Sequence, residues 1–171
     1  GLVNELPIYQ NVSSASMKQF VKGGQMDVDK EMENAIALCK KIQLKANDIT
    51  APPSSLSGGN QQKVVVAKML SSDQKVLIMD EPTKGIDNIY KEQLGILLRD
   101  LAENGKTIIL VSHDLDFCGE YSDRCGLFAQ GSLISEDTAR EFFLNNRFYT
   151  TTIAKLARGI IDGAYKMEDM L

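Results

Sequence analysis

Residues 76–83 read Val-Leu-Ile-Met-Asp-Glu-Pro-Thr, an apolar run that two carboxylates and a proline follow directly. A short apolar run bounded by charged residues is typical of a buried strand in a parallel sheet. Asp80 and Glu81 would then lie at the carboxyl end of the strand, where open α/β sheets bind their ligands. An Asp there can hold a magnesium ion through water, and a Glu beside it can polarise an attacking water. The alternative, a solvated strand end with two acidic residues, leaves the apolar run and Pro82-Thr83 unexplained.

The rest of the chain alternates between helical and strand patterns, which predicts an α/β protein. We expect two further buried strands, at 107–111 and 124–129, and a turn at Gly131. Residues 1–15 show no clear period. We expect helices from Asp27 to about Leu44, from about Gly59 to Leu70, between Tyr90 and Leu101, after Asp114, and near 137–144 and 149–158.

Composition narrows the class of protein. The chain has 171 residues, of which 43% are hydrophobic and 25% charged, as in ordinary globular domains. Its formal charge of −4 offers no electrostatic attraction to nucleic acid. Cys39, Cys118 and Cys125 match no zinc spacing and are expected to be reduced thiols in a cytosolic protein. No membrane span or signal peptide is predicted, and Gly1 in place of an initiator Met favours a piece of a longer chain.

Ser57, Gly58 and Gly59 stand directly before a predicted helix. Backbone N–H groups at a helix start have no partner and carry a positive dipole end. Ser57 can cap the helix, and glycines let an anion approach the bare N–H groups, so the pattern indicates a phosphate site. The alternative is an ordinary turn after a proline-rich loop.

His113 is the single histidine, and it follows the predicted strand at 107–111. Because the carboxyl ends of parallel strands meet at one edge of a sheet, His113 should reach the same crevice as Glu81. The alternative is a structural histidine beside Ser112 and Asp114, which would cap the next helix.

Together these segments resemble the ATP-binding cassette (ABC) ATPases. Residues 56–62, Leu-Ser-Gly-Gly-Asn-Gln-Gln, look like the signature motif of that family, with Asn60 where the commonest form has Gln. Residues 76–83 look like its Walker B strand, 84–87 like its D-loop, and His113 like its switch histidine. Order and spacing match over roughly residues 1–149. Segments 136–143 and 148–151 are similar to ATPases of the energy-coupling-factor importers of vitamins, cobalt or nickel, and there to the second cassette of two-cassette chains.

The resemblance implies a partial three-layer P-loop NTPase (RecA-like) core with a mainly parallel sheet, plus the ABC α-helical subdomain. It assigns 1–56 to the remainder of the helical subdomain and a linker, 57–135 to the signature helix and the second half of the ATPase core, and 136–171 to C-terminal helices and a tail. The implied cofactors are ATP and Mg²⁺. The implied partners are a second ABC ATPase domain and a transmembrane transporter subunit, without nucleic acid, on the cytoplasmic face of the membrane.

The resemblance also implies residue roles. Glu81 would be the general base or water-positioning group, His113 the γ-phosphate contact, and Asp80 the magnesium ligand. Asp87 would couple two sites across a dimer. The residues expected to cap the γ-phosphate that a facing cassette holds are Ser57, Gly58, Gly59 and Asn60. Two other functions stay open: a non-catalytic half-domain that offers its signature motif to a partner ATPase, and a soluble cassette ATPase acting on DNA or ribosomes.

The Gly-x-x-x-x-Gly-Lys-Ser/Thr phosphate loop of the family is absent from these 171 residues. Gly105-Lys106-Thr107 is a decoy, because Asp100 stands where the first glycine belongs and because a phosphate loop must open a helix. Without the loop, most nucleotide affinity should be lost. In the family's sheet, the strand before the loop lies between 107–111 and 124–129. We therefore expect a gap in the sheet between 107–111 and 124–129. Either another chain pairs with the strands at the gap, or the chain's own strands close it, or the chain is one half of a cut domain.

Overall fold

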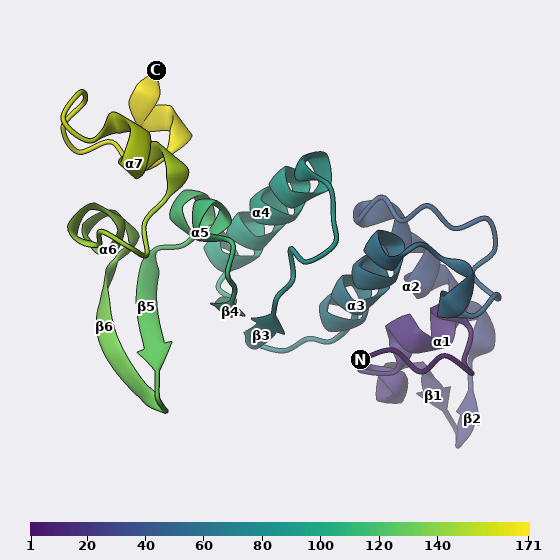
Figure 1. Ribbon diagram of the computed structural model, residues 1–171. Helices are drawn as coiled ribbons and strands as arrows, with labels where there is room; N and C mark the ends of the chain where they lie inside the picture. Colours follow the sequence, from purple (N-terminus) through teal and green to yellow (C-terminus); the bar gives the residue numbers. More distant parts are fainter.

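The computed structural model describes residues 1–171 as an elongated molecule with three groups of elements along it (Figure 1). A helical group comes first, an α/β unit follows, and a hairpin with short helices is last. The first group contains α1 (Ile8–Ser13), β1 (Val21–Lys22), β2 (Gln25–Met26), α2 (Val28–Lys41) and α3 (Gly58–Ser71). The second contains β3 (Val76–Asp80), α4 (Asn88–Glu103), β4 (Thr107–Val111) and α5 (Leu115–Tyr121). The third contains β5 (Arg124–Ala129), β6 (Ser132–Thr138), α6 (Ala139–Asn145) and α7 (Thr152–Ala157).

Local sequence signals account for most of the helices. The carboxylate of Asp27 caps α2 by accepting the N–H of Lys30 at 3.2 Å, as the sequence predicts. Helix α1 was not predicted, because its single short turn offers little periodicity. Ile8 and Val12, four positions apart, are both fully buried there. The β1–β2 hairpin was also missed, although its Gly23-Gly24 turn is a known hairpin signal.

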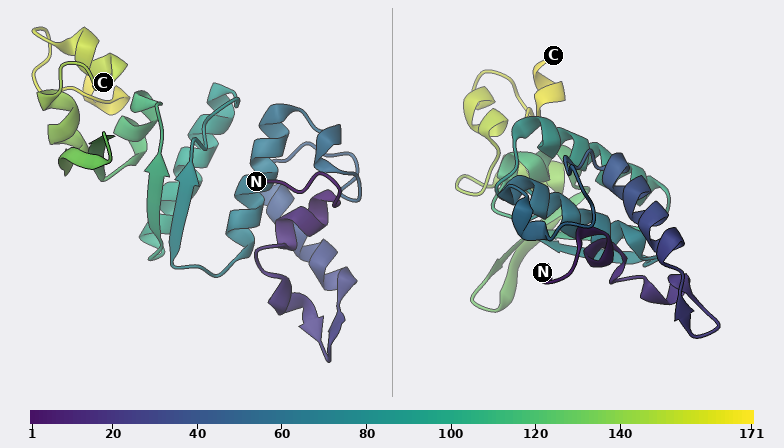
Figure 2. Two further views of the ribbon diagram at one scale, coloured as in Figure 1. Left: turned by 60° about the horizontal axis from the view of Figure 1, so that its bottom comes forward. Right: turned by 90° about the vertical axis from the view of Figure 1, so that its right-hand side faces the viewer.

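The strands form three separate two-stranded sheets instead of one mainly parallel sheet. Only β3 and β4 pair in parallel, with Val76 opposite Thr107 and Asp80 opposite Val111. The other two pairs are antiparallel. The α/β class is confirmed, but the parallel arrangement is limited to β3–β4. The predicted gap is present, since β4 and β5 do not pair and the hairpin lies apart from β3 and β4 (Figure 2).

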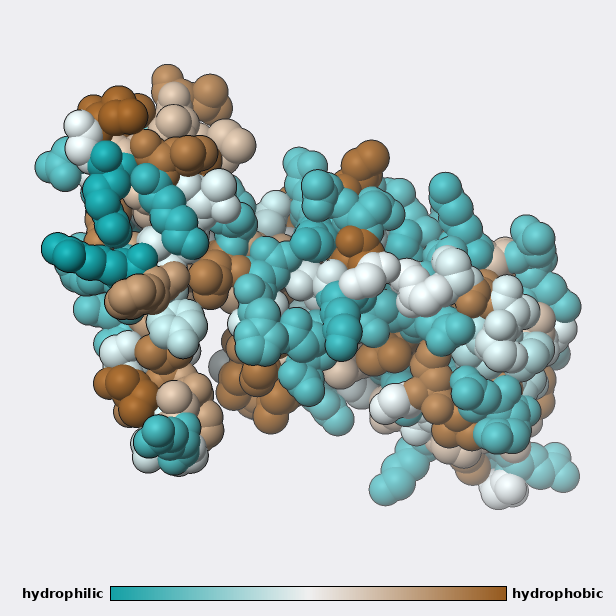
Figure 3. Space-filling view, viewed as in Figure 1, coloured by the Kyte–Doolittle hydropathy of each residue, from teal (hydrophilic) through white to brown (hydrophobic).

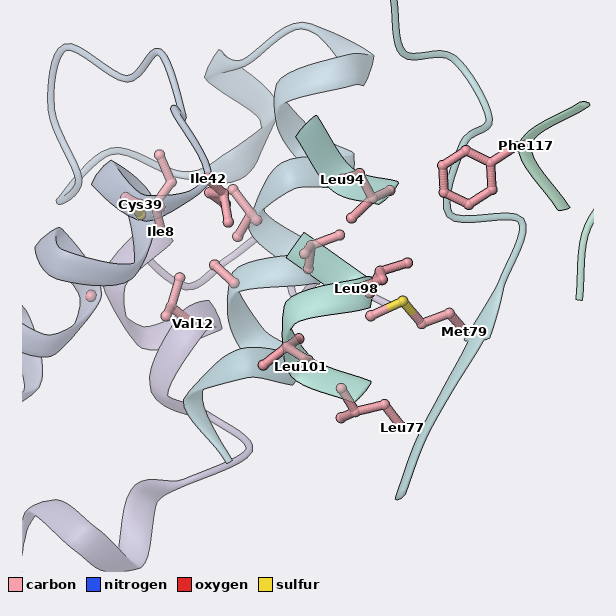
Figure 4. Packing of buried hydrophobic residues seen from close by; sticks show 14 residues of the cluster. Ile8, Val12, Cys39, Ile42, Leu77, Met79, Leu94, Leu98, Leu101 and Phe117 are labelled. Carbon is pink, nitrogen blue, oxygen red and sulfur yellow. The ribbon is translucent and has the colours of Figure 1, made fainter. Parts of the chain in front are cut away.

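One apolar core connects the helical group to the α/β unit (Figure 4). Leu77 and Met79 of β3 point toward Leu94, Leu98 and Leu101 of α4. The same core extends through α3 into α1 and α2, so the two groups of elements share a hydrophobic interior. This packing holds the α3 N-terminus and the β3 C-terminus, where the predicted site residues lie, in fixed relation.

The other face of β3–β4 is not covered, which corrects the expectation that these strands are buried. Ile78 is 63% exposed and Val111 55% exposed, and Val76 and Ile109 are exposed with them. Residues on one face of a strand alternate with those on the other, so α4 buries only every second side chain. Apolar atoms are visible around this part of the surface (Figure 3).

The C-terminal residues pack back onto α5 and α6. The backbone N–H and the hydroxyl of Thr152 donate to the two carboxylate oxygens of Asp116, at 2.6 and 2.7 Å. The Tyr165 ring stacks on Phe143 with 6.4 Å between centroids. The tail ends in a 3₁₀ turn at Met167–Met170. No helix of the chain is long and apolar enough to cross a membrane.

Candidate functional site

Glu81 is held in an unusual backbone conformation at the end of β3. Its φ of 48° is in the left-handed region, which costs a non-glycine residue about 1–2 kcal/mol. Its N–H donates to the carbonyl of Val111 at 2.8 Å, and its carbonyl accepts the N–H of Lys84 at 3.1 Å. The amide of Gln62 on α3 also donates to that carbonyl, at 3.4 Å. Backbone strain that several hydrogen bonds hold in place is often found at functional sites.

The Glu81 carboxylate meets the segment that carries His113. Its Oε1 accepts the backbone N–H of His113 at 3.0 Å, and the His113 Nε2 lies 3.7 Å from the same oxygen. The imidazole is 98% exposed, whereas the Glu81 side chain is 28% exposed. The ends of β3 and β4 therefore bring these two residues together, as their places after parallel strands predict. The high exposure of the imidazole leaves it accessible to a ligand, while Asp114 caps α5 as the structural alternative expects.

These residues line a hollow of about 540 Å³ in the surface. The hollow has two carboxylates and two ammonium groups but only one apolar side chain, so it suits a charged, hydrated ligand. Its lining residues are Glu81, Thr83, Lys84, Gly85, Ile86, Lys91, His113 and Asp114. Sequence reasoning missed Lys84 and Lys91 as site residues. Nothing local in the sequence pairs Lys91 with Asp114, because the two are brought together by packing of α4 beside β4.

Asp80 lies next to Glu81 in the chain but does not line the hollow. It is exposed on the uncovered face of β3 with Ile78, and its carboxylate makes no hydrogen bond or ion pair with the protein. No group of three or more His, Cys, Asp or Glu side chains could hold a metal ion by itself. Mg²⁺ is usually bound by one or two carboxylates together with waters and phosphate oxygens. An unpaired Asp80 fits that kind of binding as a single ligand.

The start of α3 forms a second candidate binding site. Ser57 occupies the N-cap position, but its side chain makes no capping hydrogen bond. Its Oγ accepts the side-chain amide of Asn60 at 3.1 Å, while the Asn60 oxygen accepts the N–H of Lys45 at 3.3 Å. The Ser57 hydroxyl proton and the first N–H groups of α3 thus remain free for an anion. None of these residues lines the hollow beside Glu81.

Asp87 is the N-cap residue of α4. Its Oδ1 caps α4 by accepting the N–H of Tyr90 at 2.9 Å. Lys63 of α3 lies over the Tyr90 ring, 3.9 Å from its centroid. Burial lowers the pKa of Lys63, while the Asp87 charge opposes that shift. The cap and the cation–π contact hold the start of α4 against α3.

Comparison with known proteins identifies the relatives of this chain. The family model described as "ABC transporter" matches residues 2–84. A protein of Rhizobium meliloti (strain 1021), named as a ribose/galactose/methyl galactoside import ATP-binding protein, is 37% identical over 158 residues, or 92% of this chain. The solved dimeric structure of an ATP-binding cassette in a post-hydrolysis state, bound to ADP and Pi, matches with a TM-score of 0.72 at 27% identity over 82% of this chain. The chain is therefore similar to the ATP-binding proteins of ABC transporters in both sequence and structure.

The chain spans 31% of the length of the R. meliloti protein and 60% of the solved cassette. A ribose import ATP-binding protein of Hahella chejuensis (strain KCTC 2396) is 40% identical over 78% of the chain, which spans 27% of that protein. Both relatives are named for sugar import, so they do not support the narrower resemblance to vitamin, cobalt or nickel importers.

Proposed function

We propose that this chain forms part of the nucleotide-binding domain of an ABC importer, in which ATP binding and hydrolysis drive the uptake of a sugar. The observation that carries the proposal is the Glu81 carboxylate, held by the His113 N–H at the adjoining ends of β3 and β4. The names of the relatives support a sugar as the solute. The resemblance of 136–143 and 148–151 to energy-coupling-factor ATPases supports the alternative of a vitamin or metal-ion importer.

Glu81 acts in this proposal as the general base or water-positioning group. One carboxylate oxygen, Oε1, is occupied by the His113 N–H, which leaves Oε2 free to accept a proton from water. The exposed His113 imidazole contacts the γ-phosphate. Asp80 would hold Mg²⁺ through water, and the bound ion would neutralise negative charge on the phosphate oxygens.

The start of α3 serves a facing cassette. Ser57, Gly58, Gly59 and Asn60 cap the γ-phosphate of ATP that a second ABC ATPase domain holds, and Asp87 couples the two sites. The free Ser57 hydroxyl, and the fact that none of residues 57–60 lines the hollow beside Glu81, support this division. The dimeric state of the solved cassette agrees with it. Such a domain works on the cytoplasmic face of a membrane, bound to a transmembrane subunit that selects the solute.

The proposal is tested on the whole protein that the source gene encodes. The reading frame upstream of the Gly1 codon should encode a glycine-rich phosphate loop, and that protein should hydrolyse ATP. Glu81→Gln keeps an oxygen for the His113 N–H, so ATP binding should persist while turnover falls at least about 100-fold. Glu103→Gln, a change of the same charge at the end of α4, should leave turnover unchanged. Normal turnover in Glu81→Gln would remove Glu81 from this role.

The solute needs a separate assay. Cells that carry the whole transporter should accumulate labelled ribose, xylose or galactoside in a manner that Glu81→Gln abolishes. Uptake of a vitamin or of cobalt or nickel with the same dependence would favour the energy-coupling-factor alternative.

A non-catalytic partner protein is a second candidate, favoured by the absence of a phosphate loop from the 171 residues. In that case the chain alone binds ATP weakly and stimulates another ATPase through Ser57 and the following glycines. A stop codon in frame before any phosphate loop, together with stimulation that Ser57→Ala removes, would support it over the first proposal. The formal charge of −4 gives no support to the third candidate, a soluble cassette ATPase acting on DNA or ribosomes.

A further inference from the structure

The hollow beside Glu81 contains an ion pair whose partners come from different elements. Lys91 in the first turn of α4 places its Nζ 2.6 Å from Oδ2 of Asp114, the residue after His113. The Lys91 and Asp114 side chains are 31% and 20% exposed, and every other ion pair of the chain has at least one partner that is more exposed than either. Shielding from water and salt makes such a pair stronger than one on the open surface.

We propose that Lys91 is a positioning residue, which fixes the His113 segment through Asp114 and connects it to the Asp87 end of α4. The inference rests on the proposed function, since it assigns Lys91 a role in the same site. Neither the family resemblance nor the relatives assign a role to this position.

Asp114 uses its two carboxylate oxygens for two different contacts. Its Oδ1 accepts the N–H of Phe117 at 3.1 Å and so caps α5, while Oδ2 accepts Lys91. Its own N–H donates to Oγ of Ser112 at 3.1 Å. The turn around His113 is thereby held by α5 through the cap and by α4 through Lys91. The contact of the His113 N–H with Glu81 holds it from the side of β3.

Lys91 lies one helical turn after Asp87, which caps the same helix. A displacement of the Asp87 turn therefore moves the base of the Lys91 side chain along with it. Because Lys91 forms an ion pair with Asp114, the residue next to His113, that movement is transmitted to the His113–Glu81 contact. This path gives Asp87 a physical connection to the site in its own chain.

The chain offers a matched control on the same helix. Arg99 NH1 lies 2.6 Å from Oδ1 of Asp123, which also ties α4 to the segment that follows α5. That pair is far more exposed, at 40% and 76%, and it does not touch the hollow. Loss of the Arg99 contact tests for general loosening of α4, whereas loss of the Lys91 contact tests the proposed tether.

The first measurement uses the 171-residue chain itself, in which His113 is the single histidine and gives unambiguous NMR signals. Lys91→Met should speed amide hydrogen exchange at His113 about tenfold and shift its imidazole signals, because the turn opens more often. Asp114→Asn keeps an oxygen for the Phe117 cap but cannot accept from Lys91, so it should give the same change. Lys91→Arg should restore protection, and Arg99→Met should leave His113 unchanged. Unaltered His113 exchange in both Lys91→Met and Asp114→Asn would overturn the tether.

The second measurement uses the whole protein with its upstream sequence. Lys91→Met should lower kcat about tenfold with little change in the KM for ATP, because it misplaces a group that acts on the reacting phosphate. Lys91→Arg should recover most of the loss, and Arg99→Met should show none. If the wild-type protein lacks ATPase activity, the proposed function fails while the NMR result still decides the tether. If wild type is active and Lys91→Met has normal kcat, the positioning role is wrong.

Discussion

Gly58 and Gly59 stand side by side at the start of α3, but their surroundings differ. A Cβ built on Gly59 would lie 3.1 Å from the carbonyl oxygen of Gly85, so this glycine lets α3 approach the Gly85 turn. A Cβ on Gly58 would meet nothing within 4 Å. Packing explains the first glycine, whereas no packing contact accounts for the second.

Alanine substitutions should separate the two glycines. Gly58→Ala should leave the free energy of unfolding unchanged or slightly higher, because alanine favours the helix. Gly59→Ala should be about 1 kcal/mol less stable than Gly58→Ala, because backbone must move to admit the methyl group. Urea unfolding of both variants gives the comparison. If the two variants were equally stable, the Gly85 turn would be able to move aside without a measurable loss in the free energy of unfolding.

The three cysteines give a residue-scale dependence on pH. Burial raises the pKa of Cys39 and of Cys125 from 9.0 to about 11, and that of Cys118 to about 12. Unfolded thiols ionise near pH 9 while the folded ones keep their protons, so the unfolded state binds fewer protons above that pH. Stability contributed by the buried thiols is therefore complete below pH 9 and is lost as pH rises toward 11.

This pH dependence can be measured directly. The urea midpoint should be lower at pH 10 than at pH 8.5, and replacement of all three cysteines by alanine should reduce that difference. Tyr90, whose pKa burial raises to about 12, adds a similar loss only at higher pH. A midpoint difference that the cysteine-free variant retains in full would assign it to other groups.

For strand β3, the sequence predicts the secondary structure correctly but the burial incorrectly. Its apolar run predicts a strand, and the strand is present. The same run predicts burial of both faces, but only Leu77 and Met79 are covered. A continuous apolar run allows both faces of a strand to be buried. Which faces are buried depends on the elements that pack against the strand.

Alanine at neighbouring positions of β3 tests this difference between the two faces. Met79→Ala should cost about 2–5 kcal/mol, because it opens a cavity against α4. Ile78→Ala should cost less than about 1 kcal/mol, mostly through lost strand propensity. Chemical denaturation of both variants measures the gap. Similar losses would show that something covers the Ile78 face in solution.

At the scale of the whole molecule, an uncovered apolar face and an unpaired edge of β4 lie together in the α/β unit. Soluble proteins seldom expose such faces, because they promote association with other chains. The gap between β4 and β5 has the place that the family resemblance assigns to the strand before the phosphate loop, and the strands of this chain do not close it.

The chain should therefore associate with itself at high concentration, and a charge on the sheet face should oppose this. Ile78→Lys should lower the weight-average mass in sedimentation at about 100 μM and reduce binding of a hydrophobic dye. Ile96→Lys, the same change at a 58% exposed position of α4, should do neither. A monomeric wild-type chain with low dye binding would show that the face is harmless.

Local residue patterns are sufficient to predict the elements that short-range interactions specify. Caps such as Asp27, the apolar run at 76–79 and the alternation of strands with helices depend on residues close together in the chain, so they can be read without a structure. The places of Glu81 and His113 after parallel strands also followed from pattern, because strand ends meet at one sheet edge. Local patterns do not predict four other features, which became visible in the folded chain. These are the left-handed turn at Glu81, the Lys91–Asp114 pair, the contact of Gly59 with Gly85, and the exposed face of β3–β4. Each depends on which distant segments pack together, and sequence spacing carries no record of that packing.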